Sequence, residues 1–301
     1  MASQAIVNLS LAYDGSASRG WFDDLFNHRR STLFVVAAGN TGQPVGVAAE
    51  YPGALGADWN VISVAAHDNK VPSELTSFTN YCEKVVGIAA PGCNQESWID
   101  ADHHRPISGT SQAAPWVTFA SALLASLDNR FTPAQIRNRL LISGDLLGGG
   151  DVRWNVITGS RLNIVKALLT YDDLVRVRIP DATQPLGYRV ETWLGTIKSF
   201  NGFRCSNDQR AVTQRPRDDV WAFKRQGSEA FLLTDKGSHT FSHCPADMAA
   251  STASGLTASL KIDRVALFDP NGTVADPAIV ERTFKIEELE EVIFGGVGDK
   301  I

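Results

Sequence analysis

The 301-residue chain has few of the features that assign a protein to several common classes. It contains four cysteines, which are too few to define a disulfide scaffold. No apolar run is long enough to span a bilayer, and a formal net charge of −5 argues against nucleic acid as the main partner. We therefore expect a globular protein that binds neither membrane nor nucleic acid, with enough residues for two domains.

The most informative stretch is Ser108–Pro115, which leads into an apolar run rich in alanine and leucine. That run, residues 113–125, is too long for a strand and predicts a buried helix. Because Pro115 is compatible only with the first helical turn, Ser111 falls at the helix N-terminus, where the helix dipole favours negative charge. Ser111 is thus a candidate nucleophile. The alternative is that its hydroxyl only caps the helix.

Earlier residues predict a parallel sheet. Ile6–Leu11 and Leu33–Ala38 are apolar runs typical of buried strands, and Trp21–Phe26 predicts a helix between them. Strand, helix and strand in this order predict a right-handed βαβ unit. Ligands bind at the carboxyl ends of such strands, which is where Asn40 lies.

The following segments continue the α/β pattern up to about residue 170. Two more apolar runs predict strands, residues 93–108 predict a hairpin with 100–104 at its tip, and two helices follow the one after Ser111. In chain order the predicted strands and helices are Val61–Ala66, Val85–Ala89, a capped helix beginning at Thr132-Pro133, and Asn163–Leu169.

Three of these blocks resemble motifs of the subtilisin-like serine proteases (peptidase family S8), in the same order along the chain. Gly109–Pro115 is similar to the G-T-S-M-A-x-P motif around the family's nucleophile. Phe34–Asn40 resembles the strand and turn that carry its oxyanion-hole asparagine, and Val7–Leu11 resembles the strand that flanks its substrate cleft. Gln112 and Trp116 depart from the usual methionine and histidine, at positions that supply no chemistry. The resemblance covers about residues 1–170 and implies a parallel-sheet, three-layer α/β domain.

The same resemblance implies roles for individual residues. Ser111 would be the nucleophile of a serine endopeptidase, and Asn40 would stabilise the oxyanion. The alternative for Asn40 is a turn residue after a glycine. The residues that would hold the substrate backbone are Ser10, Leu11, Ala12, Tyr13, Ala37, Ala38 and Gly39; the alternative for these is a strand end and a turn.

A general base is missing from this pattern. In the family, the catalytic aspartate and histidine precede the asparagine and serine motifs, so the resemblance implies an N-terminally incomplete domain. A missing N-terminal segment or a second chain would then supply both residues. His103 and His104 lie at the expected hairpin tip, away from Ser111, and His67-Asp68 is expected to begin a surface loop.

Residues 172–301 differ in character from the preceding part. Val175–Ile179 alternates with period two, and Asp269–Gly272 is a turn signal, so we predict a smaller β-rich accessory domain of unknown role after a partial peptidase domain over 1–170. An acidic helix is expected near Ile286–Ile293. Cysteine and histidine leave alternatives open: Cys205 and Cys244 could form a disulfide, His239, His243 and Cys244 could bind a metal, and Cys82 and Cys93 could pair or remain thiols.

The sequence therefore predicts a serine endopeptidase that acts on peptides or proteins through an acyl-enzyme on Ser111 and is inactive without the aspartate and histidine. The alternative is a non-catalytic binding protein that uses the β-rich domain to recognise a partner. We identify no cofactor and no metal ligands; the resemblance alone suggests calcium, and it favours a secreted or periplasmic location.

Overall fold

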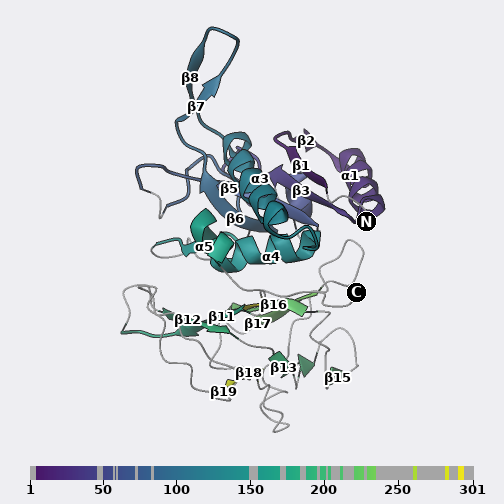
Figure 1. Ribbon diagram of the computed structural model, residues 1–301, viewed down its shortest axis with the longest axis vertical. Helices are drawn as coiled ribbons and strands as arrows, with labels where there is room; N and C mark the ends of the chain where they lie inside the picture. Colours follow the sequence, from purple (N-terminus) through teal and green to yellow (C-terminus); the bar gives the residue numbers. More distant parts are fainter. Residues whose placement is uncertain are drawn as a thin grey trace. The chain divides into compact units, whose positions relative to one another are not determined.

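The computed structural model describes most of residues 5–169 and separate strands beyond them (Figure 1). The described residues are 5–45, 50–56, 58, 60–71, 74–82, 85–148, 155–169, 174–183, 188–194, 197–200, 203–204, 211–212, 220–226, 229–234, 260–262, 282–284 and 291–294. The chain divides into two compact units, Met1–Thr170 and Tyr171–Ile301.

The first unit is built on a six-stranded sheet in the order β1-β3-β5-β6-β10-β9. All neighbouring pairs from β1 to β10 are parallel, and β9 pairs with β10 antiparallel. The strands of this unit are β1 (Ala5–Leu9), β2 (Tyr13–Asp14), β3 (Thr32–Ala37), β4 (Glu50–Tyr51), β5 (Val61–His67), β6 (Val86–Pro91), β7 (Gln95–Trp98), β8 (His104–Ile107), β9 (Asp145–Leu146) and β10 (Ser160–Arg161). The helices are α1 (Ser16–His28), the 3₁₀ turn η1 (Gly53–Leu55), α3 (Thr110–Leu127), α4 (Pro133–Ser143) and α5 (Ile164–Leu169).

Helices cover both faces of this sheet, which makes the unit a three-layer α/β domain. On one face Phe22 and Phe26 of α1 pack against Phe34 and Val36 of β3. Because side chains alternate along a strand, the neighbouring residues of β3 face the other side, where α3 lies across β1, β3, β5 and β6. Every residue of β3 and β5 is buried, as expected for central parallel strands. The predicted parallel-sheet α/β fold is confirmed.

Helix α3, which contains Ser111, positions the candidate site. Its buried side is made largely of small residues, which let the helix approach the sheet closely; these are Ala113, Ala114, Val117, Ala120, Ser121 and Leu124, with Thr110 at the first turn. The prediction that Pro115 lies in the first helical turn is wrong: it is the sixth residue of α3, so Ser111 O lacks the backbone N–H that position 115 would otherwise donate. Ser111 O accepts instead from Ser10 Oγ at 2.9 Å. The predicted capping box of α4 is present: Gln135 N donates to Thr132 Oγ1, and Thr132 N donates to Gln135 Oε1.

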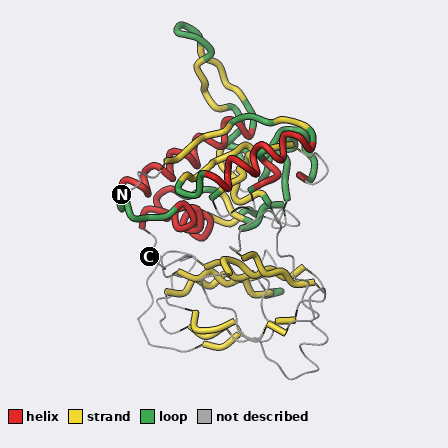
Figure 2. The backbone as a smooth tube through the Cα atoms, turned by 90° about the vertical axis from the view of Figure 1, so that its right-hand side faces the viewer, coloured by secondary structure: helices red, strands yellow, loops and turns green. Residues whose placement is uncertain are grey.

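The hairpin of β7 and β8 extends away from the rest of the first unit (Figures 1 and 2). Its two strands pair from Gln95 with Ile107 to Trp98 with His104. The hairpin is anchored at its base, where Trp116 Nε1 of α3 donates a hydrogen bond to Gln95 Oε1 at 2.9 Å. The hairpin predicted over residues 93–108 is therefore present.

The second unit contains a five-stranded sheet in the order β12-β11-β20-β16-β17, in which all pairs are antiparallel. Its strands are β11 (Leu174–Pro180), β12 (Tyr188–Leu194), β13 (Ile197–Phe200), β14 (Phe203–Arg204), β15 (Ala211–Val212), β16 (Val220–Gln226), β17 (Glu229–Thr234), β18 (Leu260–Ile262), β19 (Arg282–Phe284) and β20 (Glu291–Phe294).

The prediction of an acidic helix near Ile286–Ile293 is wrong for the C-terminal residues of that range. Residues Glu291–Phe294 form β20, which lies between β11 and β16. Acidic residues favour a helix, but the β-branched Val292 and Ile293 gain two strand neighbours here, and this pairing outweighs local propensity. The turn at residues 269–272, the two cysteines at 205 and 244, and the histidines at 239 and 243 lie outside the described residues.

Candidate active site

Ser111 is the second residue of α3, and the N-cap position of that helix is occupied by Gly109. The alternative in which Ser111 only caps the helix is therefore wrong. The Ser111 hydroxyl instead donates to the backbone oxygen of Ser10 at 3.4 Å, a long hydrogen bond. This half-buried hydroxyl, with one long hydrogen bond to the described part of the chain, lies at the positive end of an 18-residue helix.

Asn40 is held against the start of the same helix. Its Oδ1 accepts hydrogen bonds from Thr110 N at 2.8 Å and from Thr110 Oγ1 at 3.0 Å. Since these donors occupy the oxygen, the Nδ2 group is the donor end of the amide. No described residue accepts a hydrogen bond from it. Asn40 is thus an exposed amide donor tied to the residue that immediately precedes Ser111.

The threonine before Ser111 also fixes the turn that carries Asn40. Thr110 is fully buried, and its Oγ1 accepts a hydrogen bond from Gly39 N at 3.1 Å. The Thr110 side chain therefore orients both the side-chain amide of Asn40 and the backbone of Gly39, which precedes Asn40. Sequence alone does not identify Thr110 as a positioning residue. It shows that Thr110 precedes Ser111, but it does not show the contact with Asn40, 70 residues earlier in the chain.

The predicted substrate-binding residues lie at the carboxyl ends of neighbouring parallel strands. Ser10 to Tyr13 follow β1, while Ala37 ends β3 and leads through Ala38 to Gly39. Ser10 Oγ donates to Ser111 O at 2.9 Å, which joins the first segment to α3. Ala37, Ala38 and Gly39 are buried, whereas Ala12 and Tyr13 are exposed. The structure brings Ser10, Gly39, Asn40 and Ser111 together through these contacts.

None of the described histidines contacts Ser111. His103 and His104 lie in the hairpin, where they pair with Asp100 at 2.7 Å and Glu96 at 3.0 Å. Their exposed positions agree with the prediction that they lie away from the serine. They are therefore not placed as its base.

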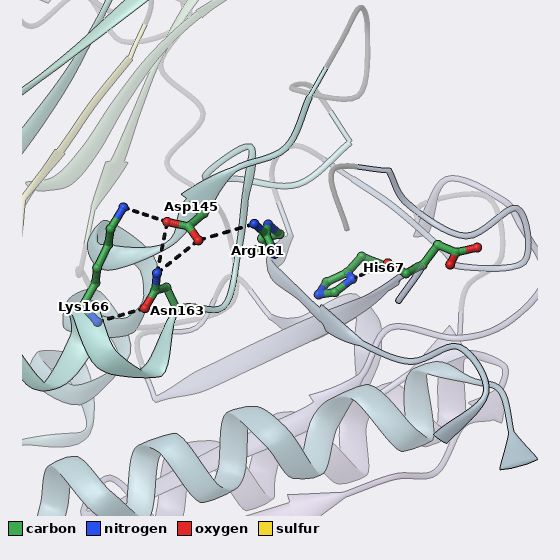
Figure 3. Close-up of polar contacts among 6 residues, drawn as sticks. His67, Asp145, Arg161, Asn163 and Lys166 are labelled. Carbon is green, nitrogen blue, oxygen red and sulfur yellow. Dashed lines mark hydrogen bonds and ion pairs between the residues drawn. The ribbon is translucent and has the colours of Figure 1, made fainter. Parts of the chain in front are cut away.

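His67 also has a different environment from the one predicted. It is the last residue of β5 and only 4% exposed, so it does not begin a surface loop. Its Nδ1 donates to the backbone oxygen of Asp68 at 3.0 Å, and the Asp68 carboxylate accepts from Lys70 N. Figure 3 shows His67 beside Arg161, whose side chain pairs with Asp145. Burial lowers the pKa of His67 below its ordinary value; the Asp68 hydrogen bond opposes this shift, and the charge of Arg161 adds to it.

A buried asparagine organises the polypeptide beneath Gly39. Asn80 Oδ1 accepts from Thr41 N at 2.9 Å, Thr41 Oγ1 at 2.8 Å and Gln43 N at 3.2 Å, and its backbone N–H donates to Gly39 O. Its Nδ2 donates to Glu50 Oε2 at 2.7 Å. The sequence contains no signal for this network, because Asn80 is far from Asn40 along the chain and belongs to no motif.

The described residues contain neither a candidate metal site nor a disulfide between Cys82 and Cys93. No group of three or more histidine, cysteine, aspartate or glutamate side chains there is arranged to hold a metal ion. Cys82 and Cys93 are both thiols, so their pairing is excluded. Among the described helices, none has the length and apolar character to cross a membrane.

A protein-family model gives the assignment that the geometry alone could not. The model described as the subtilase family (Peptidase_S8) matches residues 3–159, more than half of the chain. The chain belongs to the subtilase family. The matched region contains Ser10, Asn40 and Ser111, and it ends before the second unit.

Individual subtilases are similar to the same part of the chain. The thermostable alkaline protease of Halalkalibacterium halodurans is 35% identical over 154 residues, covering 50% of this chain and 39% of the relative. Thermitase of Thermoactinomyces vulgaris is 30% identical over 173 residues, covering 56% of each. The solved protease domain of PatA, a serine-to-alanine mutant, is 28% identical with a TM-score of 0.44, covering 55% of this chain and 58% of that one. The chain thus spans about half the length of these relatives.

Proposed function

We propose that this chain carries the nucleophile and the oxyanion-binding groups of a serine endopeptidase, with Ser111 and Asn40 in those roles. The observation that supports the proposal is the pair of hydrogen bonds from Thr110 to Asn40 Oδ1, because they leave an amide donor beside the helix start that bears Ser111. The family membership supports the same interpretation, with peptides or proteins as substrates and Ser10–Tyr13 and Ala37–Gly39 along the peptide backbone.

The proposed reaction begins when Ser111 Oγ attacks the carbonyl carbon of the scissile bond. A base takes the hydroxyl proton and later delivers it to the leaving amine, and water then hydrolyses the acyl-enzyme. The oxyanion of each tetrahedral intermediate would accept from Asn40 Nδ2 and from Ser111 N–H. The N-terminal end of α3 adds a favourable potential at this point.

We infer that the base and its orienting carboxylate come from a further N-terminal segment or from a second chain. The Ser111 hydroxyl contacts a backbone oxygen and no imidazole among the described residues. Sequencing the gene upstream of the Met1 codon distinguishes the two sources: an in-frame segment with an aspartate motif and a histidine motif indicates one chain, and a stop codon indicates two.

The test of the proposed function is labelling of the full chain with a fluorophosphonate, with and without imidazole as an external base. We expect slow labelling alone, faster labelling with imidazole, and complete loss in Ser111→Ala. Ser126→Ala is the matched control, because Ser126 lies exposed in the same helix and its hydroxyl donates to Leu123 O of that helix. Labelling that persists in Ser111→Ala would contradict the proposal.

A chain that stays unlabelled at every imidazole concentration, while correctly folded, would favour a non-catalytic binding protein. Two further expectations come from the family resemblance alone: a secreted or periplasmic location, which cell fractionation tests, and stabilisation by calcium. Thermal melting with added calcium or with a chelator tests the second.

A further inference from the structure

The turn that carries Asn40 is exposed, although the strand before it is buried. Residues 32–39 are buried, whereas Asn40, Thr41 and Gln43 lie at the surface. Backbone N–H groups of an exposed turn can bond to water as well as to protein, so such a turn keeps a single conformation only if the protein supplies the partners. The direction of the Asn40 amide therefore depends on what holds the backbone on either side of it.

One residue, Asn80, holds the backbone on both sides of Asn40. Its backbone N–H donates to Gly39 O at 3.0 Å, on the N-terminal side. Its Oδ1 accepts from Thr41 N at 2.9 Å and from Gln43 N at 3.2 Å, on the C-terminal side. Asn40 thus lies between backbone groups that are fixed by the same residue.

The Asn80 side chain has only one orientation that fits these contacts. It is fully buried, and because two backbone N–H groups donate to its Oδ1, a reversed amide would set its NH₂ group against both donors. In the observed orientation Nδ2 donates to Glu50 Oε2 at 2.7 Å. Gly39 leaves the space for this pair, since a Cβ at position 39 would collide with both atoms. The acceptor that holds the turn is therefore itself held in place.

The segment that contains Asn80 is fixed to the central sheet. Thr79 Oγ1 accepts from Ala66 N of β5 at 2.9 Å and donates to Asn80 O at 3.2 Å. Thr76 N donates to the oxygen of the same Ala66 at 3.0 Å. Because β5 is buried throughout, these bonds connect Asn80 to the most firmly packed part of the unit.

We propose that Asn80 is a positioning residue for the oxyanion donor: it holds the backbone of Asn40 so that Nδ2 points to the oxyanion, and it does not touch the substrate. The inference rests on the proposed function, in which Asn40 Nδ2 donates to that oxyanion. A donor stabilises the transition state most when its direction is fixed before the reaction, because nothing then has to reorganise. Thr110 fixes the oxygen of the Asn40 side chain, and Asn80 fixes the backbone from which that side chain extends.

The test compares Asn80→Ala with Asn60→Ala, which removes another buried asparagine whose amide bonds to backbone oxygens. We expect imidazole-assisted fluorophosphonate labelling of Ser111 to slow about tenfold in Asn80→Ala and less than about twofold in Asn60→Ala. An Asn80→Ala chain that is folded and is labelled as fast as the unmodified chain would overturn the inference.

A milder variant covers the case in which Asn80→Ala does not fold. Thr41→Val changes an exposed residue and removes the hydroxyl that donates to Asn80 Oδ1 at 2.8 Å. Labelling should slow about threefold, and Thr41→Ser, which keeps the hydroxyl, should restore it. Equal labelling of Thr41→Val and the unmodified chain would then decide against the inference.

A double-mutant cycle separates a positioning role from a general structural one. If Asn80 acts through Asn40, Asn80→Ala should add less than about twofold to the loss in Asn40→Ala, because the donor that it positions is already absent. A further tenfold loss in that background would mean that Asn80 supports the fold as a whole, and the positioning role would be wrong.

A last measurement does not require Ser111 to react. In a chain with isotopically labelled asparagine, nuclear magnetic relaxation of the Asn40 side-chain NH₂ should show an ordered amide, and a more mobile one in Asn80→Ala or Thr41→Val. An amide that is equally ordered in all three chains would contradict the inference. Failure of the proposed function appears separately, as absent labelling of the unmodified chain at every imidazole concentration.

Discussion

The two halves of the proposed active site differ in how firmly this chain holds them. Asn40 is fixed by two hydrogen bonds of 2.8 and 3.0 Å from a fully buried threonine. Among the described residues, the Ser111 hydroxyl makes one hydrogen bond, of 3.4 Å, to the backbone oxygen of Ser10. The groups that would stabilise an oxyanion are thus positioned by residues of the described unit, whereas no described residue is placed to accept the serine proton during attack. We infer that preorganisation of the oxyanion groups is a property of this unit and that activation of the serine is not.

Among variants that keep Ser111, the largest effect is expected from removing the oxyanion donor. Asn40→Ala should slow imidazole-assisted labelling about 10²–10³-fold, a magnitude known for such a donor in a subtilisin and so taken from the family and not from this structure. Asn60→Ala, at a buried asparagine that bonds to the backbone of residues 26, 29 and 32, is a control for general destabilisation. An Asn40→Ala rate within about threefold of the unmodified chain would remove the contrast between the two halves.

A smaller effect is expected from removing one hydrogen bond that holds the Asn40 amide, while keeping the amide itself. Thr110→Val deletes the hydroxyl that donates to Asn40 and accepts from Gly39 N, and it leaves that buried N–H unsatisfied, at a cost of about 1–3 kcal/mol in the free energy of unfolding. Labelling should slow by about tenfold, while Thr110→Ser should restore both labelling and stability, since it keeps the hydroxyl. Denaturant melts and labelling rates measure the two effects, and unchanged labelling in Thr110→Val would show that Thr110 does not position Asn40.

On the serine side, the corresponding deletion should matter less. Ser10→Ala removes the 2.9 Å hydrogen bond to Ser111 O, which contributes about 0.5–1.5 kcal/mol to stability. Because the Ser111 hydroxyl contacts the backbone oxygen of Ser10, which remains, we expect the labelling rate to change by less than about threefold. A loss as large as that in Asn40→Ala would mean that Ser10 organises the nucleophile, and the two halves would then be equally preorganised.

The smallest effect on labelling is expected at His67, which affects stability instead. Since its pKa is lowered in the folded protein, the unfolded chain binds the proton at a higher pH, and stability should fall as the pH drops below the ordinary value of 6.5. His67→Asn removes this titration, so its melting temperature should decline less between about pH 7.5 and 5.5 than that of the unmodified chain. Labelling at alkaline pH should stay the same, and a large loss there would make His67 a candidate base.

Sequence alone determined the local character of this protein. The Gly-Thr-Ser turn before a long alanine-rich run predicts the helix that carries Ser111, and the fully apolar Leu33–Ala38 predicts a central parallel strand. Both predictions use only residues that are close together along the chain and the apolar pattern of each run. The sequence placed Pro115 in the first turn of the helix that carries Ser111, whereas it lies in the second. The strand at Glu291–Phe294 shows the limit, because its pairing with two distant strands outweighs a local preference for helix.

Tertiary structure decided which side chains meet. Thr110 contacts Asn40 across 70 residues, Asn80 orients Glu50 across 30, and Gly39 leaves the space that the carboxylate occupies. Such contacts depend on the order of strands in the sheet and on the close approach of segments around a glycine, and no spacing in the chain encodes them. A serine that the sequence could identify as a candidate nucleophile therefore gains its proposed oxyanion donor only through the fold.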